Sequence, residues 1–125
     1  MRADREDRLD RGWGLLDREE FEGAIEVASD LLAEQPGDID AWLLSARAHF
    51  EAGEFLAAEK DLGALLDLDP ENIPARLSLA AVLYETCRFD EGLARIERIL
   101  PEDRGNPEVH QLKGLLLEMT GRCAA

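Results

Sequence analysis

Histidine and cysteine have the most versatile side-chain chemistry in this sequence, which contains two of each. Cys87 and Cys123 show no CxxC spacing, so we interpret both as free thiols without a redox or metal-binding role. His110 has no Cys or His at the spacing of a metal site. A general base requires a partner and a pocket, and we expect His49 instead to face a contact between helices and to find one hydrogen-bond partner there.

The other motifs also argue against catalysis. The acidic stretch 67–72 lacks the glycine and the distant Glu of a calcium-binding loop. The sequence contains no Gly-rich phosphate loop, no GxSxG motif and no dinucleotide-binding fingerprint. We therefore predict a protein that is not an enzyme and that requires no cofactor or metal ion.

Composition and charge narrow the class of protein further. The chain has 125 residues, 46% hydrophobic and 34% charged, which is typical of a single domain over residues 1–125. Its net charge of −14 repels nucleic acids and anionic membrane surfaces. No apolar run approaches the roughly 20 residues of a membrane span, and the charged residues 1–8 do not resemble a secretory signal. We therefore predict a cytoplasmic protein that does not insert into membranes.

The sequence repeats itself at an interval of 34 residues. Three kinds of residue keep this step: an aromatic residue (Phe21, Phe55, Phe89), small residues (Ala24, Ala58, Gly92 and Gly12, Ala46, Ala80, Gly114) and large apolar residues (Leu15, Leu83, Leu117, with His49 in between). Asp38, Asn72 and Asn106 also recur, each before an apolar-periodic segment, where a side-chain oxygen caps a helix. Abundant Leu and Ala and few aromatic residues favour helices over sheets. The pattern predicts helices over residues 5–18, 21–34, 39–52, 55–68, 73–86, 89–101 and 107–120.

These residues resemble the tetratricopeptide repeat pattern. The second unit matches best, through Trp42, Ala46, Gly53, Phe55, Ala58, Leu65 and Pro70. Arg8 and Arg76 depart from the pattern because they replace a large aromatic residue. The resemblance implies an all-α fold, an α-solenoid of antiparallel helix hairpins, with repeats over 5–38, 39–72 and 73–106 and a C-terminal capping helix over 107–120. The sequence leaves open whether the array is part of a longer one.

The resemblance also implies a concave binding groove, lined by fixed positions on the first helix of each repeat. In this sequence the predicted groove residues are Leu9, Trp13, Leu16, Asp17, Leu43, Arg47, Phe50, Glu51, Leu77, Ala81, Tyr84, Glu85, Leu115 and Glu118. Most are apolar, and the acids Asp17, Glu51 and Glu85 follow one another at the repeat interval. A complementary ligand would present an apolar face with Lys or Arg beside it, as an amphipathic helix does.

Two other interpretations stay open at this point. The apolar side chains could pack between adjacent first helices, with the acids forming an ordinary solvated face. The apolar strip or the last helix could instead mediate self-association into a homo-oligomer.

One subtype of the family holds the C-terminal carboxylate of chaperones with Lys, Asn and Arg. Here the corresponding positions are Leu9, Trp13, Leu44, Pro74 and Ser78. None of these side chains carries a positive charge, so we expect no carboxylate clamp. An acidic peptide should also be repelled by the net charge.

Overall fold

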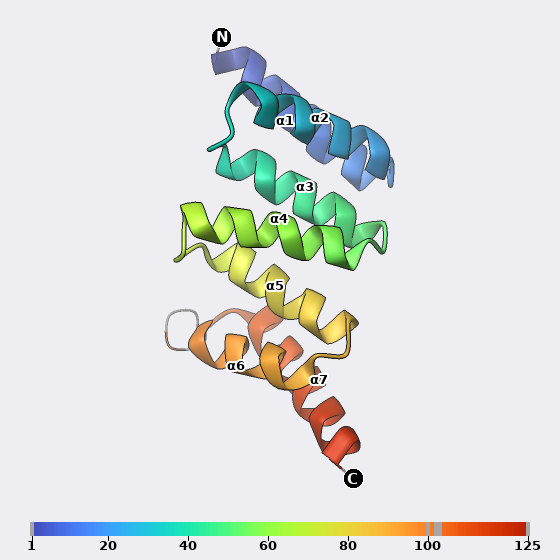
Figure 1. Ribbon diagram of the computed structural model, residues 1–125, viewed down its shortest axis with the longest axis vertical. Coiled ribbons are helices and arrows are strands. Elements are labelled where there is room, and N and C mark those ends of the chain that lie inside the picture. Colours follow the sequence, from blue (N-terminus) through green and yellow to red (C-terminus); the bar gives the residue numbers. More distant parts are fainter. Residues whose placement is uncertain (1, 100, 102–103, 125) are drawn as a thin grey trace. The chain divides into compact units, whose positions relative to one another are not determined.

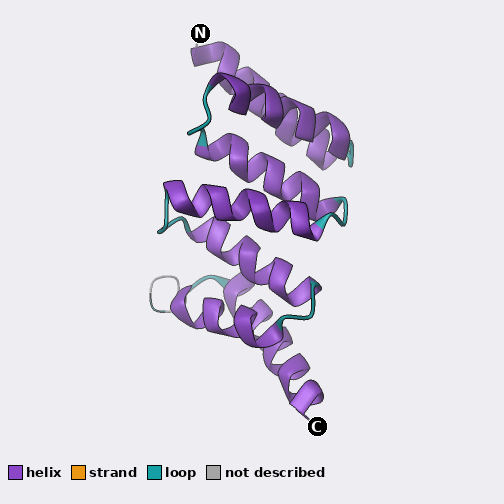
Figure 2. Ribbon diagram, viewed as in Figure 1, coloured by secondary structure: helices purple, strands orange, loops and turns teal. Residues whose placement is uncertain are grey.

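The computed structural model describes residues 2–99, 101 and 104–124. These residues form only helices and connecting loops (Figure 2). The helices are α1 (Arg2–Asp17), α2 (Phe21–Glu34), α3 (Ile39–Glu51), α4 (Phe55–Leu68), α5 (Ile73–Glu85), α6 (Phe89–Ile99) and α7 (Pro107–Ala124). Every predicted helix is present, and α2 and α4 have the predicted bounds. Helix α1 begins at Arg2 rather than residue 5, and α7 continues to Ala124 rather than ending at residue 120.

The chain forms two compact units, residues 1–70 and 71–125. Unit 1 contains α1 to α4, in which each helix contacts the next and α1 also contacts α3. Unit 2 contains α5 to α7, and all three of its helices contact one another. Consecutive helices run antiparallel within each unit (Figure 1). We call α1, α3, α5 and α7 the first helices, and α2, α4 and α6 the second helices.

Each unit has its own apolar core. In unit 1 the core residues are Leu9, Ala24, Ala28, Leu31, Ala41, Leu44 and Ala48. In unit 2 they are Ala80, Phe89, Ile96, Ile99, Val109 and Leu116. Small residues dominate the first list because alanine allows helix backbones to approach closely, while leucines fill the remaining space.

The predicted caps at the helix starts are confirmed. Asp38 accepts a hydrogen bond from the backbone N–H of Ala41 at 3.2 Å. Asn72 accepts one from Ala75 at 2.9 Å, and Asn106 accepts one from Glu108 at 2.9 Å. Each side-chain oxygen therefore satisfies a backbone donor that has no partner within its helix.

The three hairpins turn in the same way. The residues Glu19, Gly53 and Cys87 have φ values of 63°, 82° and 63°, in the left-handed region. In each turn the N–H of this residue bonds the carbonyl three residues back, and the next N–H bonds the carbonyl five residues back. This is the Schellman arrangement, which ends a helix by satisfying its last carbonyl groups.

Asp38 has a second role, because it joins α1 to the start of α3. The Arg5 guanidinium donates to both Asp38 oxygens, at 2.9 and 2.7 Å, and to Asp40 at 3.1 Å. The Asp38 side chain is buried, and the hydrogen bond from Arg5 holds its pKa below the usual value. An ion pair with two parallel hydrogen bonds fixes both the separation and the orientation of the two helices.

Two glycines lie where helices approach most closely. A Cβ atom on Gly12 would collide with the Leu44 side chain and would lie 3.2 Å from Val27 Cγ1. A Cβ atom on Gly92 would lie 2.9 Å from Leu116 Cδ2. Leu44 and Leu116 are completely buried, so neither can easily move aside.

Candidate functional site

Helix α1 carries four of the predicted groove residues. Trp13 and Leu16 are half-buried and pack against the core, while Asp17 is exposed at the end of α1. Leu9, in contrast with its predicted role, is a core residue with only 8% of its surface exposed. Little of Leu9 is therefore left for contact with a ligand.

Helix α3 carries the other four predicted residues of this unit. Leu43 and Phe50 are half-buried, and Arg47 and Glu51 are exposed. Arg47 and Glu51 form an ion pair of 3.8 Å along the helix surface. The ring of Phe50 packs edge-on against Phe55, the first residue of α4, at a centroid distance of 5.4 Å. Phe50 is thereby held in place by the hairpin turn.

In unit 2 the corresponding residues lie on α5 and α7. On α5, Leu77 and Tyr84 pack partly buried against the core, Ala81 is half-buried and Glu85 is exposed. Tyr84 forms an edge-on ring contact with Phe89 at 5.8 Å, which repeats the geometry of Phe50 and Phe55. On α7, Leu115 and Glu118 are both exposed.

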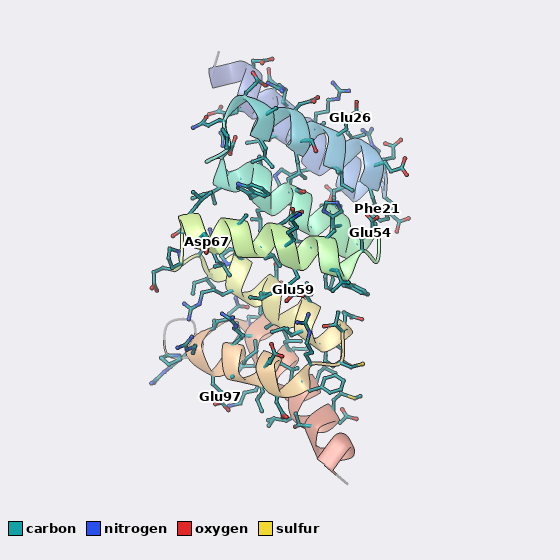
Figure 3. All side chains as sticks on the ribbon, viewed as in Figure 1. Phe21, Glu26, Glu54, Glu59, Asp67 and Glu97 are labelled. Carbon is teal, nitrogen blue, oxygen red and sulfur yellow. The ribbon has the colours of Figure 1, made fainter. Side chains whose placement is uncertain are left out.

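Acidic side chains are not confined to the first helices. In unit 1, Glu26 on α2 and Asp67 on α4 are exposed and are labelled on the second helices in Figure 3. Glu97 on α6 gives unit 2 an exposed acid of the same kind. The negative charge is therefore a general property of the surface. Half-buried apolar side chains also occur on the second helices, for example Ile25 and Val27 of α2, so neither property alone distinguishes the first helices.

His49 has the hydrogen-bond partner that the sequence predicted, but the group around it was not foreseen. His49 Nδ1 lies 2.7 Å from Asp61 Oδ2 of α4, and Ser45 Oγ donates to the same oxygen at 2.7 Å. Ser45 Oγ and His49 Nδ1 are 3.4 Å apart. We call Ser45, His49 and Asp61 the polar cluster of the second hairpin.

The polar cluster has the residue types of a catalytic triad but not its geometry. In a triad the serine and the aspartate address opposite nitrogens of the imidazole, so that the histidine can transfer a proton. Here Ser45 and Asp61 both lie beside Nδ1. The cluster therefore joins α3 to α4 and does not activate the serine.

The cysteines and histidines show no sign of a shared metal site in the part of the chain that the structure describes. No group of three His, Cys, Asp or Glu side chains is placed to hold a metal ion among these residues. Cys87 is exposed in the turn between α5 and α6, and the side chain of Cys123 lies outside the described residues. None of the described helices is long and apolar enough to cross a membrane.

Comparisons with known proteins agree with the repeat. Two models described as tetratricopeptide repeat match residues 9–73 and 50–116, each more than half of the chain. Aryl-hydrocarbon-interacting protein-like 1 from Mus musculus is 39% identical over 56 residues, which are 45% of this chain and 17% of that protein. The protein of this name from Bos taurus matches equally well. The chain therefore spans less than a fifth of these relatives.

Solved structures show the same fold. The first TPR domain of the human RPAP3 protein has a TM-score of 0.89 at 17% identity, covering 94% of this chain and 93% of that one. The first TPR of Spaghetti (RPAP3) bound to the HSP90 peptide SRMEEVD has a TM-score of 0.85 at 18% identity, covering 97% and 94%. The fold is an all-α helical-repeat solenoid. With the family models, the repeat and the hairpins in agreement, the chain belongs to the tetratricopeptide repeat family.

Proposed function

We propose that this protein is an interaction adaptor, and that it binds a partner segment that combines apolar with basic side chains. The supporting observation is the set Trp13, Leu16, Leu43 and Phe50, which are half-buried on the contacting helices α1 and α3. Binding is favoured when a ligand completes the burial of such side chains, because this removes apolar surface from water. We call these four residues the first-helix face of unit 1.

The chemistry of the partner follows from charge. Asp17 and Glu51 are exposed on the same two helices, and the whole chain carries a net charge of −14. These charges attract lysine and arginine and accelerate their encounter with the protein. An amphipathic helix with basic residues beside an apolar stripe therefore suits the first-helix face best.

The same reasoning disfavours acidic chaperone peptides. A solved relative of the same fold holds the peptide SRMEEVD, and other structures of this fold are complexes with Hsp70 and HSP90 peptides. In this chain, two of the positions expected for a carboxylate clamp are Leu9 and Leu44, both buried in the core of unit 1. Neither leucine side chain carries a positive charge that could hold a carboxylate.

Binding of two labelled peptides tests the proposal. The probes are an amphipathic helix of leucine and lysine and the peptide SRMEEVD, each followed by fluorescence anisotropy. We expect the leucine–lysine peptide to bind and SRMEEVD to bind far more weakly. Phe50→Ala and Leu43→Ala should each weaken the first interaction about tenfold, the effect of losing an anchor worth roughly 1.4 kcal/mol.

Leu56→Ala is the matched control, because Leu56 is a leucine of α4 with 75% of its surface exposed. It should leave affinity unchanged, whereas non-specific attraction to the acidic surface would leave all the variants equal. Circular dichroism checks that the helices persist. Wild-type affinity in both Phe50→Ala and Leu43→Ala, or tighter binding of SRMEEVD, would refute the proposal.

A further inference from the structure

Helix α7 exposes a face that the other first helices cover. It carries Gly114 and Leu117 at positions 34 residues after Ala80 and Leu83 of α5. In α5 both residues are buried, with 0% and 2% of their surface exposed. A Cβ atom on Gly92 of α6 would lie 3.4 Å from Leu83 Cβ and 3.5 Å from the Ala80 carbonyl oxygen. The second helix of the hairpin thus lies directly over this pair.

The hairpin of α1 and α2 shows how the contact is built. A Cβ atom on Gly12 would lie 3.2 Å from Val27 of α2. A Cβ atom on Gly23 of α2 would lie 3.2 Å from Leu15 Cδ1. The leucine of the first helix therefore lies over a glycine of the second, and four residues later a valine lies over the glycine of the first. Both contacts depend on an antiparallel neighbour with this spacing.

On α7 the corresponding residues are open. Apart from the adjoining residues and nearby backbone of α7 itself, no described atom comes within 4 Å of a Cβ atom built on Gly114 or on Gly121, one turn beyond Leu117. Leu117 is 48% exposed. The opposite side of α7 is already used, because Val109 and Leu116 are completely buried in the core of unit 2. We call Gly114, Leu117 and Gly121 the outer face of α7.

We propose that the outer face of α7 binds one α-helix of another protein, antiparallel to α7, in place of a second helix. The hairpin geometry defines that helix: it carries a small residue over Leu117 and, four residues later, a residue of valine size over Gly114. A second copy of this chain fits less well, because two surfaces of chains with a net charge of −14 repel each other. The partner helix accordingly carries basic residues on its exposed side.

A peptide taken from α2 is the probe for this site. It comprises residues 21–34, which contain Gly23 and Val27 at the required spacing. The substitutions Glu22→Lys, Glu26→Lys and Asp30→Lys make it basic, and all three residues are exposed on α2, with Glu26 visible in Figure 3. Both ends are blocked to remove the terminal charges, and a fluorophore reports binding to the full chain by anisotropy.

Gly114→Leu is the decisive variant, because it places a bulky side chain at a position where a Cβ atom meets no described atom outside the nearby backbone of α7. We expect it to weaken binding of the peptide at least tenfold. Gly63→Leu is the matched control, since Gly63 is an exposed glycine of α4 whose Cβ position is equally open, and it should bind as the wild type does. The peptide with Gly23→Leu should also bind at least tenfold more weakly.

Several results would overturn the proposal. One is wild-type affinity in Gly114→Leu, and another is no binding of the peptide to the wild-type chain. A third is a dimer, detected by light scattering, that Gly114→Leu dissociates, because that result would assign the face to a second copy. Because this peptide is amphipathic and basic, it also suits the first-helix face of unit 1, so Gly114→Leu and Gly63→Leu are measured again in a Phe50→Ala background. The loss caused by Gly114→Leu should persist there, so the proposal stands or falls separately from that for the first-helix face of unit 1.

Discussion

At the scale of single residues, the part of the chain that the structure describes has three positions with left-handed backbone, and only one of them is glycine. Glu19 and Cys87 adopt φ values of 63°, where a side chain crowds the following carbonyl group. Gly53 occupies the corresponding position of the second hairpin without this crowding. The first and third turns therefore store strain that the second does not.

Replacing Cys87 by glycine should release this strain. A left-handed residue with a side chain costs about 1–2 kcal/mol, and the greater freedom of glycine in the unfolded chain returns part of that gain. We expect Cys87→Gly to raise the free energy of unfolding by about 0.5–1 kcal/mol, measured by urea denaturation. Cys87→Ser keeps the strain and removes the thiol, so it should give no gain. If Cys87→Ser raised the free energy of unfolding equally, the gain would come from removing the thiol and not from releasing strain.

Asp38 combines two roles that the sequence revealed only in part. Its position before an apolar-periodic segment predicted the helix cap. The bond to Arg5 could not be predicted, because the two residues are 33 positions apart and meet only when α1 lies beside α3. The arginine then keeps the carboxylate charged and lowers its pKa.

The lowered pKa predicts how stability depends on pH. The contribution of Asp38 is complete above its unfolded pKa of about 4, and it disappears as the pH falls through the lower folded value. Asp38→Asn keeps a capping oxygen but loses the charge, and we expect it to cost about 1–2 kcal/mol near neutral pH. Urea denaturation of both proteins should show this gap closing as the pH falls below the unfolded pKa of about 4. A gap that stays constant as the pH falls would contradict the assignment.

At the scale of helices, the same residue type has opposite effects in different places. Gly12 lies where a Cβ atom would strike the buried Leu44, while Gly63 of α4 has open space around it. Glycine lowers helix stability at both positions. Only at Gly12 does close packing require it.

Alanine substitutions separate these two effects. We expect Gly63→Ala to stabilise unit 1 by about 0.5–1 kcal/mol through helix propensity. Gly12→Ala should destabilise it by about 1–2 kcal/mol, because overpacking outweighs that gain. Thermal unfolding followed by circular dichroism measures both. Stabilisation by both substitutions would mean that α1 and α3 separate more easily than their packing indicates.

At the scale of the whole molecule, the interval of 34 residues predicted the family, the helices and their caps. It succeeded because one pattern repeated through the chain constrains every copy. The same interval also indicated where the strained turns lie, since Glu19 and Cys87 are 34 residues before and after Gly53. That signal was missed because glutamate and cysteine rarely adopt left-handed backbone.

The remaining features depend on contacts that periodicity does not encode. Leu9 has the spacing of a surface residue on α1, yet α2 and α3 complete its burial in the core of unit 1. The contact of Asp61 with His49 could not be predicted from the sequence, because acidic residues are common in this chain. Only the pairing of α3 with α4 brings Asp61 to His49. Side-chain partners across helices therefore required the structure.

The polar cluster of Ser45, His49 and Asp61 also affects how the chain reaches its native pairing. Repeat proteins can misfold by matching a helix with the wrong neighbour, because their helices are so similar. If α3 paired with a second helix other than α4, His49 would face Val27 or Arg95, the counterparts of Asp61. Neither residue can accept a hydrogen bond through its side chain, so the imidazole would lose its partner on the second helix. The polar cluster thus favours the native pairing of α3 with α4 over pairings with the other, similar helices of the array.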